Sequence, residues 1–173
     1  DPEDPRIAAF RDIRERDLAG RGEHFVIEGE VVLRTAFRGG RFPVEAVLLA
    51  EKRVAGLSDL IAALPANVPV YAAGQAVMDA IVGFPIHRGI LALGRRRAAA
   101  SADALLGAIE GPAVVVALFG IGNHDNMGGI FRNAAAFGAR AVLLGGDCCD
   151  PLYRKAIRVS VGAALTTPFA HLA

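Results

Sequence analysis

Two short apolar runs bracket a helical segment in the C-terminal part of the chain, and this unit constrains the fold more than any other feature. The runs are "AVVVALF" (113–119) and "RAVLLGG" (140–146), and neither alternates apolar with polar residues. Uninterrupted apolar strands are typical of parallel sheets that are covered on both faces. Parallel strands need a crossover connection, which the helical pattern between the runs supplies. With a further helix at 151–165 and a strand at 167–173, the sequence predicts a parallel, Rossmann-like α/β domain.

The residues before this unit predict a second, smaller α/β domain. A helix is expected around Ile7–Leu18, behind Pro5. Strands are then predicted at 24–29, 44–50, 68–74 and 88–94, and helices at 30–40, 57–64 and 75–83. Gly39 and Gly40 would close the first of these helices, and Ser58 would cap the second.

A segment rich in arginine and alanine separates the two series of elements. It opens with Arg95, Arg96 and Arg97 and runs into a short helical pattern. A solvated connector is favoured over a patch that grips RNA. We therefore divide the chain into a domain at 1–94, a linker at 95–111 and a domain at 112–173.

Composition excludes several classes of protein. The chain has 173 residues and is 53% hydrophobic, which is enough to bury a core. No apolar run reaches the roughly 18 residues that span a bilayer, and no secretory signal opens the chain. The only cysteines, Cys148 and Cys149, are adjacent and form no disulfide framework, so we expect a reduced, cytoplasmic protein. Because the first residue is Asp1, we expect the natural start to have been trimmed.

The basic residues say little by themselves about the partner. The net charge is only +1, and all basic residues except Lys52 and Lys155 are arginines. Arginine suits bidentate contacts to phosphate, but a GC-rich genome produces the same bias. Both explanations stay open.

The loop after the first apolar run superficially copies a dinucleotide-binding turn. It contains Gly120 and Gly122, and the next strand ends near Asp147. However, the third glycine of that fingerprint would fall at Asp125, where a carboxylate repels a pyrophosphate. The helix is also expected to begin late, with Asn126 as its N-cap. Both observations argue against a dinucleotide site.

The segment "NMGGIFRNA" carries a more specific pattern. Its fixed positions are Asn126, Gly128, Ile130, Arg132 and Ala134. They match the first motif of the SpoU/TrmH family of RNA ribose 2′-O-methyltransferases, which the chain resembles. The segment "RKAIRVSVGAALTTPF" is similar to the family's next conserved stretch, and "FVIEGEVVLRTA" and "IHRGILALG" resemble its N-terminal substrate-binding domain, which has the fold of a ribosomal protein.

The resemblance implies an enzyme that moves a methyl group from S-adenosylmethionine to RNA, with rRNA favoured over tRNA. It also implies that the S-adenosylmethionine site lies in a C-terminal trefoil knot. The loops that form the knot would follow Ala173, so we expect no cofactor-binding residue in this chain and expect it to be part of a longer enzyme. Family members dimerise through that region, so we expect a homodimer of the complete protein and an uncovered apolar sheet edge here.

The candidate site residues follow from this resemblance and from the residue types. Arg132 and Asn126 are the candidate catalytic residues. Arg132 would neutralise a phosphate and stabilise the attacking oxygen, since an arginine base would need a pKa far below about 12. The candidate RNA-binding residues are Arg158, Ser160, Glu28, Arg34 and Arg88.

Each of these residues also has a purely structural explanation. Arg132 could be an ordinary surface arginine, Arg158 could complement a helix dipole, and Glu28 could be a first-turn helix carboxylate. Gly128 and Gly129 either admit a partner or ease helix packing. His87 and His124 lack partners at metal-ligand spacing, so no metal is expected. The alternative function is an RNA-binding module without catalysis.

Overall fold

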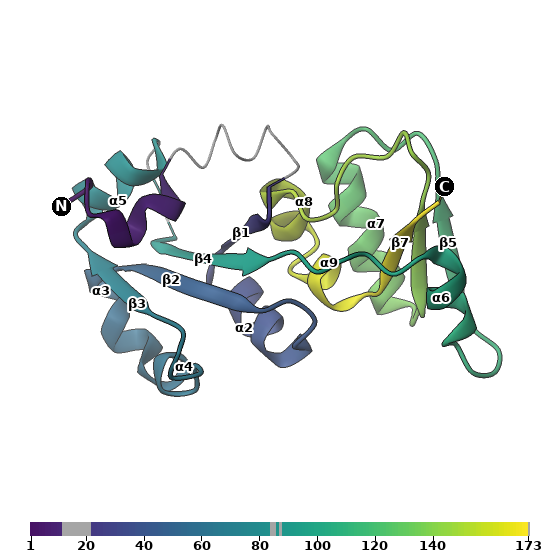
Figure 1. Cartoon of the computed structure of the whole chain (residues 1–173), viewed down its shortest axis with the longest axis horizontal. Coiled ribbons are helices and arrows are strands. Elements are labelled where there is room, and N and C mark those ends of the chain that lie inside the picture. The colour runs from purple at the N-terminus through teal and green to yellow at the C-terminus, as the bar shows by residue number, and fades with distance from the viewer. Residues whose placement is uncertain (12–21, 84–85, 87, 173) are drawn as a thin grey trace.

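The chain folds into two α/β halves that lie side by side (Figure 1). The structure is a computed structural model, and it describes residues 1–11, 22–83, 86 and 88–172. The strands form a four-stranded sheet in the order β1-β4-β2-β3 and a three-stranded sheet in the order β5-β6-β7. The α/β fold class predicted from the sequence is confirmed.

The first half is built on a mixed sheet. Its strands are β1 (His24–Glu28), β2 (Val44–Ala50), β3 (Val70–Ala73) and β4 (Ile90–Arg95), close to the predicted ranges. Strand β4 pairs antiparallel with β1 and β2, whereas β2 and β3 are parallel. The helical elements are η1 (Pro5–Phe10), α2 (Glu30–Gly39), α3 (Glu51–Val54), η2 (Ala55–Leu57), α4 (Ser58–Ala62) and α5 (Gln75–Val82).

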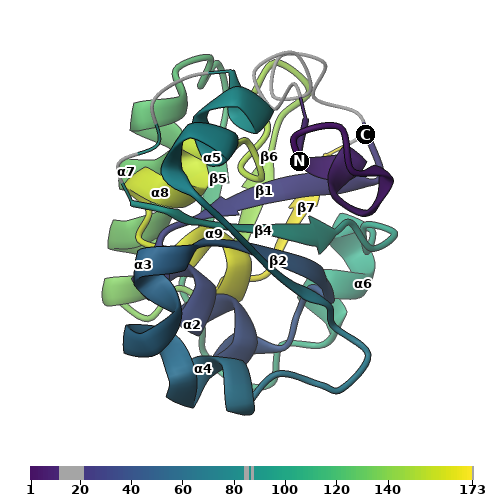
Figure 2. The ribbon, with the colours of Figure 1, turned by 90° about the vertical axis from the view of Figure 1, so that its left-hand side faces the viewer.

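Helices cover both faces of this sheet. Figure 2 shows α5 and η1 on one side of the sheet and α2, α3 and α4 on the other. Alternate residues of β1 follow this division: Val26 packs in the cluster with Phe10 and Met78, whereas Phe25 and Ile27 pack in the larger cluster on the other face.

The second half contains the predicted parallel sheet. Its elements are α6 (Ala102–Gly107), β5 (Val115–Leu118), α7 (His124–Ala136), β6 (Ala141–Leu144), α8 (Arg154–Val159), α9 (Ala163–Thr166) and β7 (Phe169–His171). All the strand pairs are parallel. Every residue of β6 is buried, whereas two of the four residues of β5 are exposed and only Leu118 is buried. The prediction that the strands are covered on both faces therefore holds for β6 and is wrong for β5, where Val114 and Phe119 at the strand ends are 58% and 64% exposed.

The two halves share one hydrophobic cluster. It joins Phe25 and Leu33 of the first half to Phe131 and Leu165 of the second. Helix α2 packs against α9, and at Gly39 a Cβ atom would lie 2.8 Å from the Thr166 Cγ2 atom. The domain boundaries at 94 and 112 thus stay a proposal, since the core continues across them.

Arg41 adds a polar contact between the halves. Its Nη1 atom donates a hydrogen bond of 2.8 Å to the Thr167 carbonyl oxygen, and its Nη2 atom donates one of 3.4 Å to that of Phe169. The guanidinium lies 4.5 Å from the ring centroid of Phe169 and 4.9 Å from that of Phe42. Burial lowers the pKa of Arg41. The edge of β7 that faces away from β6 is thus covered by an arginine from the other half.

The local predictions need four corrections. Helix α7 begins at His124 with Asn123 as its N-cap, so Asn126 is not the cap and the late start used against a dinucleotide site is wrong. The helix predicted at 151–165 is broken into α8 and α9, because Val161 (φ 54°) and Gly162 (φ 86°) adopt left-handed conformations. Ser58 is the first residue of α4 and makes no cap hydrogen bond. The N-terminal helix is a 3-10 turn up to Phe10, and residues 12–21 of the predicted Ile7–Leu18 helix lie outside the described residues.

Candidate active site

Helix α7 carries the motif that the sequence singled out. The Asn123 Oδ1 atom accepts hydrogen bonds from the backbone nitrogens of Asp125 (2.7 Å) and Asn126 (3.2 Å), which fixes the first turn. Met127, Phe131 and Ala134 form the buried face of the helix at the spacing expected for one stripe. The motif therefore combines an anchored apolar face with an opposite face that is open to solvent.

Arg132 lies on that solvent face. Its side chain is exposed, and within the described ranges it makes no hydrogen bond or ion pair. Side chains of helical residues lean toward the helix N-terminus and cover the residues one turn earlier. One turn earlier lies Gly129, where an added Cβ would meet no atom within 4 Å. Arg132 is thus a cation without a partner beside open space.

Asn126 is exposed in the first turn of the same helix. It precedes Arg132 by six residues, which places it about 9 Å along the helix axis and on a different side of the helix. In the part of the chain that the structure describes, the two side chains form no hydrogen bond with each other. A joint catalytic role of Asn126 and Arg132 would therefore need a substrate that spans both.

Gly128 lies where α7 packs closely against α8. A Cβ atom at this position would lie 2.6 Å from the Ala156 carbonyl oxygen and 2.8 Å from the Val159 Cβ atom. Of the two explanations for Gly128 and Gly129, helix packing thus applies to Gly128, whereas Gly129 leaves room for a partner.

The two glycines form a matched pair for a stability test. We expect Gly128→Ala to lower the free energy of unfolding by about 1–3 kcal/mol, because the methyl group overlaps backbone that cannot move alone. Gly129→Ala should instead raise it by about 0.5–1 kcal/mol, since alanine is the better helix former and the site is open. Urea unfolding of both variants measures the difference. Equal changes in the two variants would contradict the packing role of Gly128.

Glu28 and Arg158 were predicted separately and lie together in the structure. Glu28 is the last residue of β1 and is buried, so the explanation as a first-turn helix carboxylate is wrong; Glu30 holds that position. The Glu28 Oε2 atom accepts hydrogen bonds from the Nη1 atoms of Arg154 (2.8 Å) and Arg158 (3.5 Å). This cluster joins β1 of the first half to α8 of the second, and Arg154 was not identified from the sequence.

Ser160 is buried in the turn between α8 and α9. Its Oγ atom donates to the Ile157 carbonyl oxygen (2.9 Å) and accepts from the Ala164 nitrogen (3.2 Å). At Gly162 a Cβ atom would lie 2.9 Å from the Thr35 Cγ2 atom, so the turn packs closely on α2. The turn between α8 and α9 thus shapes the contact between the halves. An RNA-binding role of Ser160, Glu28 or Arg158 stays a prediction.

Arg34 and Arg88 differ in how accessible their guanidinium groups are to a ligand. Arg34 donates to Glu30 and to Asp59, with its shortest contact to an Asp59 oxygen at 2.8 Å. The hydrogen bonds to Asp59 and then to Glu30 raise the pKa of Arg34, and those from Arg34 lower the pKa of Asp59. Arg88 is exposed and lines an open cavity of about 570 Å³ together with Lys52 and Arg53. Arg88 is therefore the better placed of the two for an anionic ligand.

The remaining candidates are the histidines and the adjacent cysteines. His124 stacks on Tyr153 with ring centroids 3.9 Å apart, and His87 lies outside the described residues. No group of three or more His, Cys, Asp or Glu side chains is placed to hold a metal ion there. Burial, followed by the neighbouring Cys148, raises the pKa of the Cys149 thiol, which favours a packing role. No described helix is both long and apolar enough to cross a membrane.

Comparison with known proteins identifies the second half of the chain. Residues 113–173 match the model of the SpoU rRNA Methylase family. A Mycobacterium bovis protein named as an uncharacterized tRNA/rRNA methyltransferase is 40% identical over 177 residues, covering 100% of this chain and 59% of the relative. The 23S rRNA (guanosine-2′-O-)-methyltransferase RlmB of Bordetella pertussis is 34% identical over 93 residues, covering 53% of this chain and 38% of the relative.

A solved structure shows the same fold over nearly the whole chain. The SpoU methyltransferase AviRb of Streptomyces viridochromogenes, in complex with the cofactor AdoMet, superposes with a TM-score of 0.76 at 19% identity. The match covers 98% of this chain and 63% of AviRb. The chain thus spans less than two thirds of the length of these relatives. The motif on α7 and the names of the relatives agree with the match of residues 113–173 to the SpoU rRNA Methylase family.

Proposed function

We propose that the complete protein transfers a methyl group from S-adenosylmethionine to a ribose 2′-hydroxyl of RNA. The observation that carries this proposal is Arg132, an exposed cation without a partner on the motif helix, beside the open space over Gly129. The names of the relatives support RNA as the substrate class, and the name of the Bordetella relative specifies the 2′-oxygen of a guanosine in rRNA.

Arg132 would act by charge and by position. A ribose hydroxyl that attacks a methyl carbon develops negative charge on its oxygen, and a fixed guanidinium can stabilise that charge. The same planar group can hold a neighbouring phosphate in a bidentate contact and so orient the ribose. Because an arginine stays protonated, it would stabilise the oxygen rather than remove its proton. Asn126, two turns earlier, would contact the nucleotide from the N-terminal end of α7.

S-adenosylmethionine would supply the electrophilic methyl group. Ligands of parallel α/β sheets bind where the strands end, which here is at the loops 119–123 and 145–153. Buried side-chain atoms that lack a hydrogen-bond partner belong, in the described ranges, to Arg53, Gln75 and Arg96, and none of them comes from these loops. We propose that the donor site is formed in the part of the complete protein that this chain does not span, since the chain covers 59% of the Mycobacterium bovis relative.

The first half would bind the RNA substrate. The cavity next to the N-terminus of α2 is lined by Lys52, Arg53 and Arg88, and Glu30 is its acidic residue. Such a basic surface fits contacts to the phosphate backbone, which weaken with increasing salt. We propose rRNA rather than tRNA as the substrate and a cytoplasmic homodimer as the working form. The exposed apolar residues at the edge of β5 are compatible with an interface.

A methyl-transfer assay tests this proposal against the alternative of an RNA-binding module without catalysis. The complete protein is incubated with unmodified rRNA or tRNA and tritiated S-adenosylmethionine, and the product is hydrolysed with alkali. A 2′-O-methyl group blocks cleavage at its own nucleotide, so we expect the label in alkali-resistant dinucleotides from rRNA. Label in single nucleotides would show base methylation, and RNA binding without transfer would favour the binding module.

A further inference from the structure

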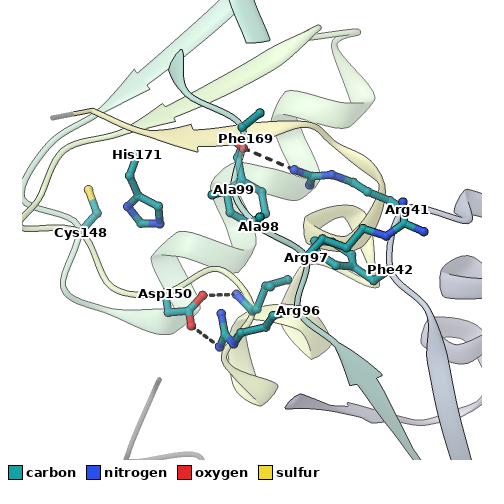
Figure 3. A pocket seen from close by; sticks show the side chains of 12 residues that line it. Arg41, Phe42, Arg96, Arg97, Ala98, Ala99, Cys148, Asp150, Phe169 and His171 are labelled. Carbon is teal, nitrogen blue, oxygen red and sulfur yellow. Dashed lines mark hydrogen bonds and ion pairs between the residues drawn. The ribbon is translucent and has the colours of Figure 1, made fainter. Parts of the chain in front are cut away.

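A second cavity lies between the segment that joins the halves and the C-terminal strand. It has a volume of about 580 Å³ and is walled by Arg96–Ala100, by β7 and by the loop before α8 (Figure 3). Its size falls in the range of about 300–1,000 Å³ that is typical of small-molecule sites. The candidate site residues named above do not line it; these are Arg132, Asn126, Arg158, Ser160, Glu28, Arg34 and Arg88.

The charges on the wall favour an anion. The lining contains Arg41, Arg96, Arg97 and one acid, Asp150. Arg41 donates to the carbonyl groups of β7, as described above. Arg96 forms an ion pair with Asp150, which also accepts a hydrogen bond from the Leu152 nitrogen, so this carboxylate is already neutralised. The net charge of the lining is therefore positive even with His171 neutral.

Arg97 differs from Arg41 and Arg96 in this respect. Arg95 pairs with Glu45 at 3.4 Å and Arg96 pairs with Asp150, but Arg97 is exposed and forms no hydrogen bond or ion pair in the part of the chain that the structure describes. The arginine triplet predicted as a solvated connector thus contains two structural residues and one guanidinium that remains available to a ligand.

The rest of the wall offers groups that suit a nucleobase. Ala98, Ala99 and Ala100 have no backbone hydrogen bonds to other described residues, so their peptide groups are free to pair with a base edge. The methyl groups of these alanines, together with Phe42 and Phe169, give apolar surface. The His171 ring is exposed at the far end of the wall and provides a face for stacking.

We infer that this cavity binds one nucleotide of the RNA substrate, with its phosphate on Arg97 and its base against Ala98–Ala100 and His171. The inference rests on the proposed function for the identity of the partner as RNA. S-adenosylmethionine fits the site less well, because its sulfonium gives it a net positive charge that the positively charged wall disfavours.

Titration of the 173-residue chain with adenosine 5′-monophosphate (AMP) tests the inference without any methyl transfer. We expect stoichiometric binding by calorimetry that is weakened about ten-fold or more in Arg97→Ala, because a charge-assisted contact is lost. Ala99→Trp should abolish binding, since the indole fills the cavity from an exposed position. Arg140→Ala is the matched control, because Arg140 is an exposed arginine outside the cavity. Adenosine and inorganic phosphate, titrated separately, should each bind more weakly than AMP.

The opposite results would overturn the site. These are no AMP binding at millimolar concentration, equal AMP affinity in Arg97→Ala and the parent chain, or displacement of AMP by S-adenosylmethionine. Circular dichroism and urea unfolding confirm that each variant is folded. A different result would contradict the proposed function. In that case the complete protein would transfer no methyl group, even though AMP binds to the chain as expected.

Discussion

Replacing Arg132 with alanine is expected to lower the rate of methyl transfer by the complete protein about a hundred- to a thousand-fold. One preorganised charge contact to a developing oxyanion is worth about 2.7–4 kcal/mol at the transition state. The stability of the fold should change by no more than about 0.5 kcal/mol, because the Arg132 side chain is exposed and forms no hydrogen bond or ion pair within the described residues. The effect should therefore appear in the chemistry and not in the amount of folded protein.

Two further variants sharpen this experiment. Arg140→Ala removes an equally exposed arginine elsewhere in the same half and should leave transfer unchanged. Arg132→Lys keeps the charge but loses the planar fork, so recovery of less than full activity would indicate that bidentate geometry matters. Transfer is measured as tritium incorporated into unmodified rRNA. Parent-like turnover of Arg132→Ala would show that this arginine is an ordinary surface residue and would remove it from the active site.

Replacing Glu28 with glutamine is expected to destabilise the chain by about 2–3 kcal/mol. The Glu28 carboxylate is buried at the junction of β1 and α8, where it accepts from Arg154 and Arg158. Hydrogen bonds to charged groups contribute about 1.5–3 kcal/mol each, and loss of the charge also leaves partly buried guanidinium groups facing an uncharged amide. Since Arg158 remains partly open to water, the loss should stay below the largest values known for buried pairs.

The exposed carboxylate Glu45 provides the control for Glu28. Glu45 pairs with His24 and Arg95 at the surface, so Glu45→Gln should cost no more than about 1 kcal/mol. Urea unfolding of both variants gives the comparison. If Glu28→Gln were as stable as the parent but bound rRNA less well, Glu28 would be an RNA contact rather than a junction between the halves.

Local signals in the sequence were sufficient for most of the elements. The segments 44–50 and 140–146 were each predicted to form a strand, and each contains one within that range. The pair Gly39–Gly40 ended α2 as predicted, with Gly40 in the left-handed conformation at φ 59°. In each case the residues that decide the structure lie within one turn or one strand of each other.

The errors arose where distant residues decide the local structure. At the break between α8 and α9, Gly162 packs closely against Thr35 of the other half, a contact that the local sequence does not reveal. The Glu28–Arg154 pair joins residues that are 126 positions apart, so no local sequence pattern predicted it. The start of α7 is a different case, because Asn123 is itself a good N-cap residue and carried the signal that would have corrected the prediction.

The two edge strands of the parallel sheet, β5 and β7, differ because the Arg41 guanidinium covers the outer side of β7. It already occupies the carbonyl groups of Thr167 and Phe169 on the outer side of β7. Strand β5 pairs only with β6 in the described ranges, and the apolar residues at its ends are open to solvent. An additional strand, from the same polypeptide or from a neighbour, can therefore join the sheet beside β5 but not beside β7. The sheet can therefore be extended only at its β5 edge, away from the half that contains Arg41.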